Sequence, residues 1–340
     1  MLDRVLSHDP PRSRALALIL VVIVAGLGAA PFLFPGSKSL DVAAKMLVFI
    51  LLVASYDLLL GYTGIVSFAH TMFFGIGAYG VAIASTAYGP GWGALALGIA
   101  GALVLSLALA LVIGLFSLRV KAIFFAMITL AVASAFQTLA SQLSDFTGGE
   151  DGLSFTTPLA GRVASYYLLF FAVAVLFLLL LRIVNSPFGR VLQAIRENDF
   201  RAEAIGFRGV VYRTWSNVIG AGFATAAGAL LAIWLRYTGP DTTLGFEVML
   251  DILLIVVIGG MGTMYGAVLG AVVFVFAQNY LQDGLRAASR ALSGVPFAST
   301  LLTPDRWLFW LGLLFVLSVY HFPTGLVGRL RAFALRGGRR

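Results

Sequence analysis

Apolar segments of about 20 residues recur along the whole chain, and this pattern constrains the fold more than any other feature. A helix of about 20 residues crosses the hydrocarbon core of a bilayer. Only 11% of the residues are charged, against about 25% in a soluble domain. The sequence therefore predicts an all-α, polytopic membrane protein with a single transmembrane domain over 1–340. Its ten expected spans are 15–34, 43–60, 70–87, 93–116, 123–143, 164–182, 214–236, 246–260, 265–281 and 306–321.

Basic residues indicate on which side of the membrane each connection lies. Arginine and lysine gather at the N-terminus, in 117–122, in 183–213 and after 328, whereas the loop 144–163 is mainly acidic. Ten spans place the four basic regions on one side, and the positive-inside rule makes that side the cytoplasm. Both termini are therefore expected to be cytoplasmic. The net charge of +8 follows from this distribution and gives no reason to expect nucleic acid as a partner.

The first apolar segment has a second interpretation. Basic residues precede it, and it ends near Ala29-Ala30, as in a cleaved signal peptide. The apolar Phe32-Leu33-Phe34 follows at once, which favours a span that stays in the membrane.

Several kinds of chemistry find no support in the composition. Cysteine is absent and the only histidines are His8, His70 and His321, so neither a disulfide nor a metal site is expected. No Gly-x-x-x-x-Gly-Lys-Ser/Thr loop occurs, so the chain is not expected to bind ATP by that route. No catalytic constellation is apparent, which makes an enzyme the least favoured class.

One amphipathic segment, 187–206, interrupts the apolar pattern on the predicted cytoplasmic side. Ser186 suits a helix N-cap, Pro187 the first turn and Gly206 the C-terminal stop. Small apolar residues recur at helical spacing, and charges of both signs fill the other face. This mixture favours docking into a groove of a partner protein over lying on lipid headgroups. The residues expected to serve this contact are Gly189, Arg190, Ala194, Ile195, Arg196, Glu197, Asn198, Glu203 and Gly206.

A glycine-rich run at 61–80 contains too many glycines for an ordinary span. Glycine permits non-helical backbone and close helix contacts, and freed backbone groups at membrane depth need protein or water around them. Polar residues in and beside the run favour a translocation path; the alternative is that the glycines only pack helices. The path candidates are Asp57, Tyr62, Thr63, Gly64, Ser67, His70, Thr71 and Tyr79.

A second glycine-rich run covers 259–270. Gly262, Gly266 and Gly270 follow one another at a spacing of four, which gives a smooth helix face for close packing. A packing or hinge role is therefore expected for this run, including Gly259 and Gly260. The outer loop 144–153 is either a plain surface turn, or an external gate or docking point for a soluble receptor. Its candidate residues are Gly148, Gly149, Asp151 and Gly152.

Two further patterns concern the membrane interior. Tyr62-Thr63-Gly64 follows the second span and Tyr237-Thr238-Gly239 the seventh, on opposite predicted sides, which is typical of an inverted repeat. Two ordinary turns are an equal alternative. Ionisable residues inside spans are costly and suggest function. Here they are Lys45, Asp57, Glu247 and Asp251, for which a capping or interfacial role is the alternative.

Taken in order, these motifs resemble the LivM-type permease of branched-chain amino-acid ABC importers. The matching stretches are Gly61–Gly64, Ser67–His70, Phe74–Tyr79, Thr147–Leu153, Gly189–Asn198, Ala202–Gly206, and 259–270 with its glycines. The resemblance spans nearly the whole chain. The family usually has Asn where Asp57 stands, Gln where Ile65 stands and Gly where Ala69 stands. These departures surround the expected path and leave the substrate open.

The resemblance implies a division of labour among several subunits. A second homologous permease would form the path together with this one, in the bacterial inner (plasma) membrane. Two cytoplasmic ABC ATPases would use ATP and hold the permeases through 187–206, and a periplasmic binding protein would deliver substrate. Hydrophobic amino acids are the expected substrate, with urea, short amides or small carboxylates as alternatives. A secondary carrier or channel working alone is the alternative from another class.

Overall fold

The computed structural model describes residues 14–33, 36–117, 122–159, 161–291, 303, 306–322 and 324–330. Ten helices within this part are long and apolar enough to cross a membrane, which confirms the all-α polytopic class. The two ends of the chain, on which the predicted cytoplasmic termini depend, lie outside the described residues, as does the basic connection 118–121.

The long helices coincide with the expected spans and differ from them mainly at their ends. α3 begins at Ser37 rather than 43, because the polar residues before the apolar stretch continue the same helix. The long helices are α2 (Arg14–Leu33), α3 (Ser37–Thr63), α4 (His70–Tyr88), α5 (Trp92–Ser117), α6 (Ala122–Gln142), α8 (Arg162–Val184), α11 (Gly209–Leu235), α13 (Phe246–Gly259), α14 (Met264–Ala291) and α16 (Trp307–His321).

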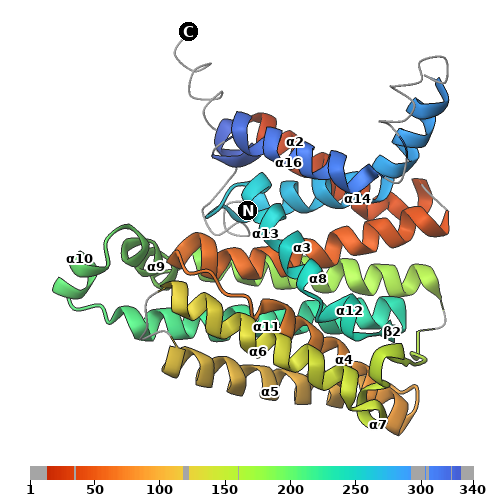
Figure 1. Cartoon of the computed structure of the whole chain (residues 1–340), viewed down its shortest axis with the longest axis horizontal. Coiled ribbons are helices and arrows are strands. Elements are labelled where there is room, and N and C mark those ends of the chain that lie inside the picture. The colour runs from red at the N-terminus through yellow and green to blue at the C-terminus, as the bar shows by residue number, and fades with distance from the viewer. Residues whose placement is uncertain are drawn as a thin grey trace.

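Short elements form the two ends of the helix bundle. α9 (Pro187–Glu197) and α10 (Asp199–Ala204) lie at one end, and α7 (Ser144–Thr147) and the 3₁₀ helix η1 (Gly149–Asp151) lie near the other (Figure 1). There too, β1 (Leu153–Ser154) pairs antiparallel with β2 (Tyr237–Thr238), with Leu153 opposite Thr238. The short helix α12 (Pro240–Thr243) follows β2 directly.

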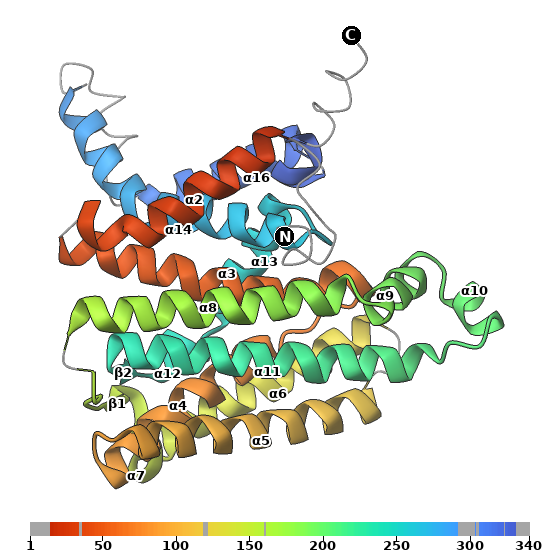
Figure 2. The same cartoon turned by 180° about the vertical axis from the view of Figure 1, so that it is seen from behind.

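α3 is the central helix of the bundle. In its most apolar stretch 94% of the residues are buried, against 28% or less in the corresponding stretches of α2, α5, α6, α8 and α16. Figures 1 and 2 show α5 and α6 on one side of the bundle and α2 and α16 on the opposite side, with α13 and α14 between α3 and the latter pair. The outer helices therefore present apolar side chains to their surroundings, as a membrane protein requires.

Glycines allow α4 to approach its neighbours at backbone distance. A Cβ atom on Gly77 would collide with the carbonyl of Thr225 in α11, and one on Gly228 would collide with the carbonyl of Phe74. On the other side of α4, a Cβ on Gly80 would lie 2.8 Å from the carbonyl oxygen of Gly98 in α5. Helices that lack a hydrophobic driving force in lipid associate through such close contacts of small residues.

Two helices of 27 residues each, α3 and α11, are followed by non-helical backbone. After α3, Gly64 takes a left-handed conformation with φ 74° and residues 64–69 are not helical before α4 begins. After α11, Arg236 takes a similar conformation with φ 55°, and α13 has only 14 residues. That is about 21 Å, shorter than a bilayer core of about 30 Å. The segment therefore reaches the length of a span only when α12 is counted with α13, over 240–259. The two breaks lie at opposite ends of the bundle (Figure 1); the inverted repeat stays a prediction.

Candidate functional site

Asp57 lies in the last two turns of α3 and is almost fully buried, with 1% of its surface exposed. The backbone amide of Gly262 donates to both of its carboxylate oxygens, at 2.9 and 3.1 Å. Gly262 lies in the turn between α13 and α14 with φ +77°, a left-handed conformation that glycine adopts at little cost. The carboxylate therefore links the end of α3 to this turn.

Gly61 lies one turn further along α3, between the carboxylate and the turn. A Cβ atom at this position would lie on the carboxylate of Asp57 and on the amide nitrogen of Gly262. Any side chain here would therefore separate the two groups. The glycine is required by the close approach of two backbones, which the sequence could only indicate as glycine density.

Arg196, on α9, reaches the same place from the amphipathic segment. Its guanidinium donates to the carbonyl oxygen of Gly61. Its side chain also packs close to Gly64 and Gly262, where added Cβ atoms would lie 3.3 and 2.9 Å from it. We call the group Asp57, Gly61, Arg196 and Gly262 the junction. It joins three sequence motifs that were recognised separately: 61–80, 187–206 and 259–270.

The amphipathic segment consists of two short helices rather than one. α9 starts at Pro187, as predicted. The Ser186 hydroxyl does not cap it, because it donates to the carbonyl of Ile183 at 2.6 Å. The helix then breaks at Asn198, whose side-chain oxygen accepts a hydrogen bond of 3.0 Å from the Arg201 amide and caps α10. The ion pair between Asp199 and Arg213, at 3.0 Å, holds α10 against α11. The segment is thereby a folded part of the protein and not a loose loop.

The expected contact residues of this segment divide between two faces. Gly189 and Ile195 are buried against the bundle, and a Cβ on Gly189 would collide with the carbonyl of Val184 at the end of α8. Ala194 is half-buried. The outward face carries Arg190, Glu197, Asn198, Glu203 and Gly206. Arg196 is also exposed, but its guanidinium turns inward to the Gly61 carbonyl.

Two large apolar side chains also point outward from this segment. Phe200 is 88% exposed and Ile205 is 67% exposed. Sequence reasoning did not single out Phe200; its position between Asp199 and Arg201 on a polar face was the available signal. Exposed apolar side chains surrounded by mixed charges form a surface suited to a protein partner.

Most of the expected path residues lie in the core of this chain. Tyr62, Thr63, Ser67, His70 and Thr71 are all buried, and Gly64 is exposed beside α9. A ring nitrogen of His70 is 2.8 Å from the hydroxyl of Ser55. The first residue of α4 therefore lies beside α3 about two turns before the end of α3 at Thr63. Ser55, which sequence reasoning missed, is a hydroxyl in an otherwise apolar stretch. Their role in a path stays a prediction.

The non-helical backbone before α4 has hydrogen-bond partners inside the protein. The Phe68 amide donates to the Thr129 hydroxyl of α6 at 3.0 Å, and the Ala69 amide contacts the Ser67 hydroxyl at 3.3 Å. Backbone groups at membrane depth need such partners because lipid supplies none.

Tyr79 lies apart from the other path candidates. It lines a cavity of about 550 Å³ between α4, α5 and α6 whose walls are mostly apolar. The structure therefore does not bring the expected path residues together around one cavity within this chain.

The glycines of the 259–270 run that lie within helices pack α13 against α14. A Cβ on Gly259 would collide with the carbonyl of Gly266, and one on Gly270 with the carbonyl of Ile255, so α13 and α14 touch at their backbones. Gly262 lies outside α14 and belongs to the junction. Gly260, with φ +114°, packs on the backbone of Thr324.

The outer-loop residues are held against the break after α11. Gly152 has φ +68°, and a Cβ there would collide with the carbonyl of Thr238. The Tyr237 hydroxyl donates to the carbonyl of Asp151 at 3.1 Å. Gly148 and Gly149 form left-handed turns just before this pairing. The loop is thus attached to β2; whether it serves as a gate or a docking point stays a prediction.

Comparison with known proteins agrees with the resemblance. A family model described as the permease component of branched-chain amino acid transport systems matches residues 39–318. The high-affinity branched-chain amino acid transport system permease protein LivM of Salmonella typhimurium is 27% identical over 299 residues, 79% of this chain and 68% of the relative. The protein of the same name from Escherichia coli is 26% identical, over 78% and 68%.

A third relative matches a shorter part of the chain. The probable branched-chain amino acid transport permease protein LivM of Methanocaldococcus jannaschii is 28% identical over 220 residues, 62% of this chain and 61% of the relative. No solved structure matches the chain. Because the family model covers well over half of the chain and its motifs occur in order, this multi-pass membrane protein belongs to the family of permease components of branched-chain amino acid transport systems.

Proposed function

We propose that this chain is the permease subunit of an ATP-driven importer for branched-chain or other hydrophobic amino acids, located in the bacterial inner membrane. The names of its relatives describe transport of branched-chain amino acids. The chain would form half of the translocation path and have no catalytic activity of its own. A second, homologous permease would complete the path, and a periplasmic binding protein would deliver the substrate.

The observation that carries this proposal is the junction. α9 and α10 expose Phe200, Ile205 and Glu197 outward while Arg196 binds the carbonyl of Gly61 inward. A cytoplasmic ATPase that holds the outward face would move Arg196 and, through it, the ends of α3 and of the turn at Gly262. ATP hydrolysed by two such partners would thereby change the packing of the central helices.

Purification in mild detergent, followed by mass spectrometry, tests the proposed assembly. The tagged chain is expected to bring with it a second permease and P-loop ATPases. Glu197→Lys reverses an exposed charge on the outward face and is expected to release the ATPases while the chain stays in the membrane. Glu150→Lys, which changes an acid that is also exposed but lies at the other end of the bundle, is the control and is expected to retain them.

Uptake into proteoliposomes tests the proposed energy source. Labelled leucine is expected to accumulate only when the ATPases and ATP are on the side of α9 and α10. A chain that purifies alone and accumulates substrate from an ion gradient would instead be a secondary carrier. Accumulation of urea or short amides, but of no amino acid, would overturn the proposed substrate.

A further inference from the structure

Three polar side chains from three different helices meet inside the membrane-spanning part of the bundle. The ammonium of Lys45 on α3 donates to the side-chain oxygen of Gln278 on α14 at 2.8 Å. The amide nitrogen of the same glutamine donates to a carboxylate oxygen of Asp251 on α13 at 3.1 Å. The glutamine thus stands between a lysine and an aspartate. We call these three residues the polar bridge.

The polar bridge lies at membrane depth. Lys45 is eight residues from the start of α3 at Ser37, and Gln278 is 14 residues from the start of α14 at Met264. At 1.5 Å per residue these separations are about 12 and about 21 Å along two long apolar helices. Ionised groups at such a depth are costly in lipid and face a cavity, water or another protein.

All three side chains are only partly buried within this chain. The ion pairs among the described residues include neither Lys45 nor Asp251. A lysine ammonium has three donors and a carboxylate accepts several hydrogen bonds, so each keeps capacity for a further partner. Glu247, one turn before Asp251 on α13 and exposed, adds a second acid on the same face.

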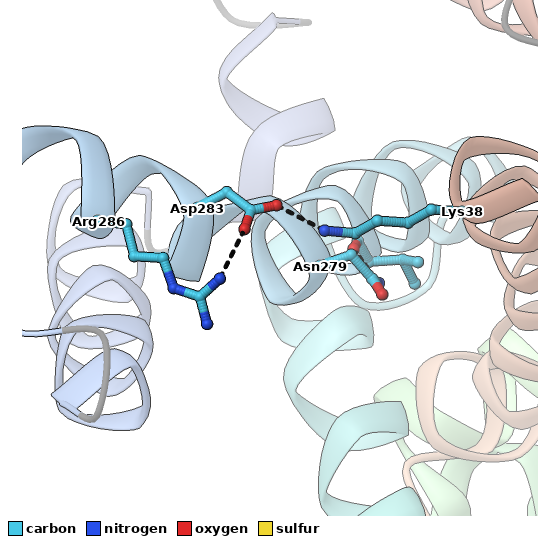
Figure 3. A network of polar contacts seen from close by, with 5 residues as sticks. Lys38, Asn279, Asp283 and Arg286 are labelled. Carbon is cyan, nitrogen blue, oxygen red and sulfur yellow. Dashed lines mark hydrogen bonds and ion pairs between the residues drawn. The ribbon is translucent and has the colours of Figure 1, made fainter. Parts of the chain in front are cut away.

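A second group of polar side chains lies between the polar bridge and the end of the bundle that is predicted to be outside. Lys38 lies two turns from Lys45 on the same face of α3, and its ammonium is 2.5 Å from a carboxylate oxygen of Asp283 on α14. Arg286 approaches the same carboxylate at 3.8 Å. Figure 3 shows Asp283 between Lys38 and Arg286, with Asn279 beside Lys38. A second polar contact between α3 and α14 therefore lies nearer that end of the bundle than the polar bridge.

We propose that the polar bridge binds the carboxylate and ammonium groups of a free α-amino acid as it crosses the membrane. Such a molecule carries a carboxylate and an ammonium on one carbon. Lys45 would receive the carboxylate, Asp251 the ammonium, and the Gln278 amide can both donate and accept. This proposal rests on the proposed function, and it adds a site to which neither the glycine-rich run nor the junction contributes.

Thiol labelling tests the site without measuring transport. The chain has no cysteine, so Leu281→Cys introduces a single reactive group one turn from Gln278 on α14 and keeps all three residues of the polar bridge. In the assembled importer a water-soluble maleimide is expected to label this cysteine, and leucine is expected to slow the labelling. Labelling that leucine leaves unchanged would overturn the proposal. A cysteine that reacts in the isolated chain but not in the assembled importer would also overturn it, because this face would then be a contact between permeases. A cysteine that reacts in neither state would overturn it as well.

Uptake kinetics provide the second test. Lys45→Met and Asp251→Asn are each expected to raise the KM for leucine about tenfold or more, since each removes a hydrogen bond to a charged group. Isoamylamine lacks the carboxylate, so its competition with leucine is expected to weaken less in Lys45→Met than competition by valine. Asp41→Asn is the control, because Asp41 lies on the same helix as Lys45. The substitution removes the ion pair of 2.7 Å between Asp41 and Arg162 on α8, and it is expected to leave the KM for leucine unchanged.

The two proposals fail differently. If the wild-type importer accumulates no amino acid, the proposed function is wrong. If it accumulates leucine while Lys45→Met and Asp251→Asn keep the wild-type KM, the proposed function stands and the binding site does not.

Discussion

The amide of Gly262 donates to both carboxylate oxygens of Asp57, at 2.9 and 3.1 Å, although the two residues are 205 positions apart. The end of α3 is thereby attached to the turn between α13 and α14. Arg196 attaches α9 to the same place through the carbonyl of Gly61. A displacement of α9 would therefore act on both halves of the bundle at once.

Asp57→Asn is expected to be tolerated and Asp57→Leu is not. Asparagine keeps one acceptor for the Gly262 amide, so about 0.5–1.5 kcal/mol of folding stability would be lost. Leucine leaves that amide without its acceptor, at a cost of about 1–3 kcal/mol. Thermal unfolding in detergent measures the difference. A leucine variant as stable as the wild type would show that the hydrogen bonds contribute nothing.

Gly61→Ala is expected to destabilise the junction, because its Cβ would lie on the Asp57 carboxylate and the Gly262 amide. Gly101→Ala on α5 is the matched control, since nothing lies within 4 Å of a Cβ at that position. The alanine at 61 is expected to lower the unfolding temperature, and the alanine at 101 to leave it or raise it slightly. Equal unfolding temperatures in the two variants would contradict the close packing seen here.

Arg196→Met is expected to separate ATP hydrolysis from transport. The variant keeps the exposed residues Glu197 and Phe200, so the ATPases still bind, but α9 loses its hydrogen bond to Gly61. Leucine uptake should fall at least tenfold while ATP hydrolysis continues. Arg182→Met, which removes an exposed arginine near the end of α8, should preserve both activities. Uptake at the wild-type rate in Arg196→Met would remove the junction from the mechanism.

Gly189→Ala is expected to impair transport without preventing insertion into the membrane. Its Cβ would collide with the Val184 carbonyl and displace α9 from the end of α8. Gly189→Pro should do so more strongly. The membrane fraction, measured by immunoblot, is expected to be unchanged, while uptake falls. Loss of the protein from the membrane would instead indicate a folding defect.

Gly152→Ala is expected to detach the outer loop from β2. The residue combines a left-handed φ of +68° with a Cβ position against the Thr238 carbonyl. Gly89→Ala separates the two effects, because Gly89 has φ +80° with open space around it. Hydrogen exchange of the Leu153–Ser154 amides should accelerate only in Gly152→Ala. Acceleration in neither variant would show that the pairing tolerates the added atom.

The sides of the membrane can be assigned with single cysteines, since the chain has none of its own. Phe200→Cys is expected to react with an impermeant maleimide only from the cytoplasm, and Glu150→Cys only from outside. The expectation follows from the basic residues around α9 and the acidic outer loop. Labelling of both positions from one side would contradict the predicted orientation.

Local properties of the sequence predicted the spans and the start of α9. A run of about 20 apolar residues is long enough to cross a bilayer core, so it predicts a span without information about the other helices. Pro187 after Ser186 likewise predicts a helix start from a few adjacent residues. The ordered glycine-rich motifs predicted the family. The start of α3 was missed because Lys38 and Asp41 continue the helix before its apolar stretch.

Only the tertiary structure decided which residues meet. The contacts between Arg196 and Gly61, and between Asp57 and Gly262, join residues 135 and 205 positions apart. Such contacts depend on how helices cross, which no local pattern records. The same applies to the polar bridge, where Lys45 and Asp251 gain a shared partner in Gln278. The apolar runs specify that each helix lies in the membrane; close packing between backbones, permitted at the glycines, specifies which polar groups each helix brings together.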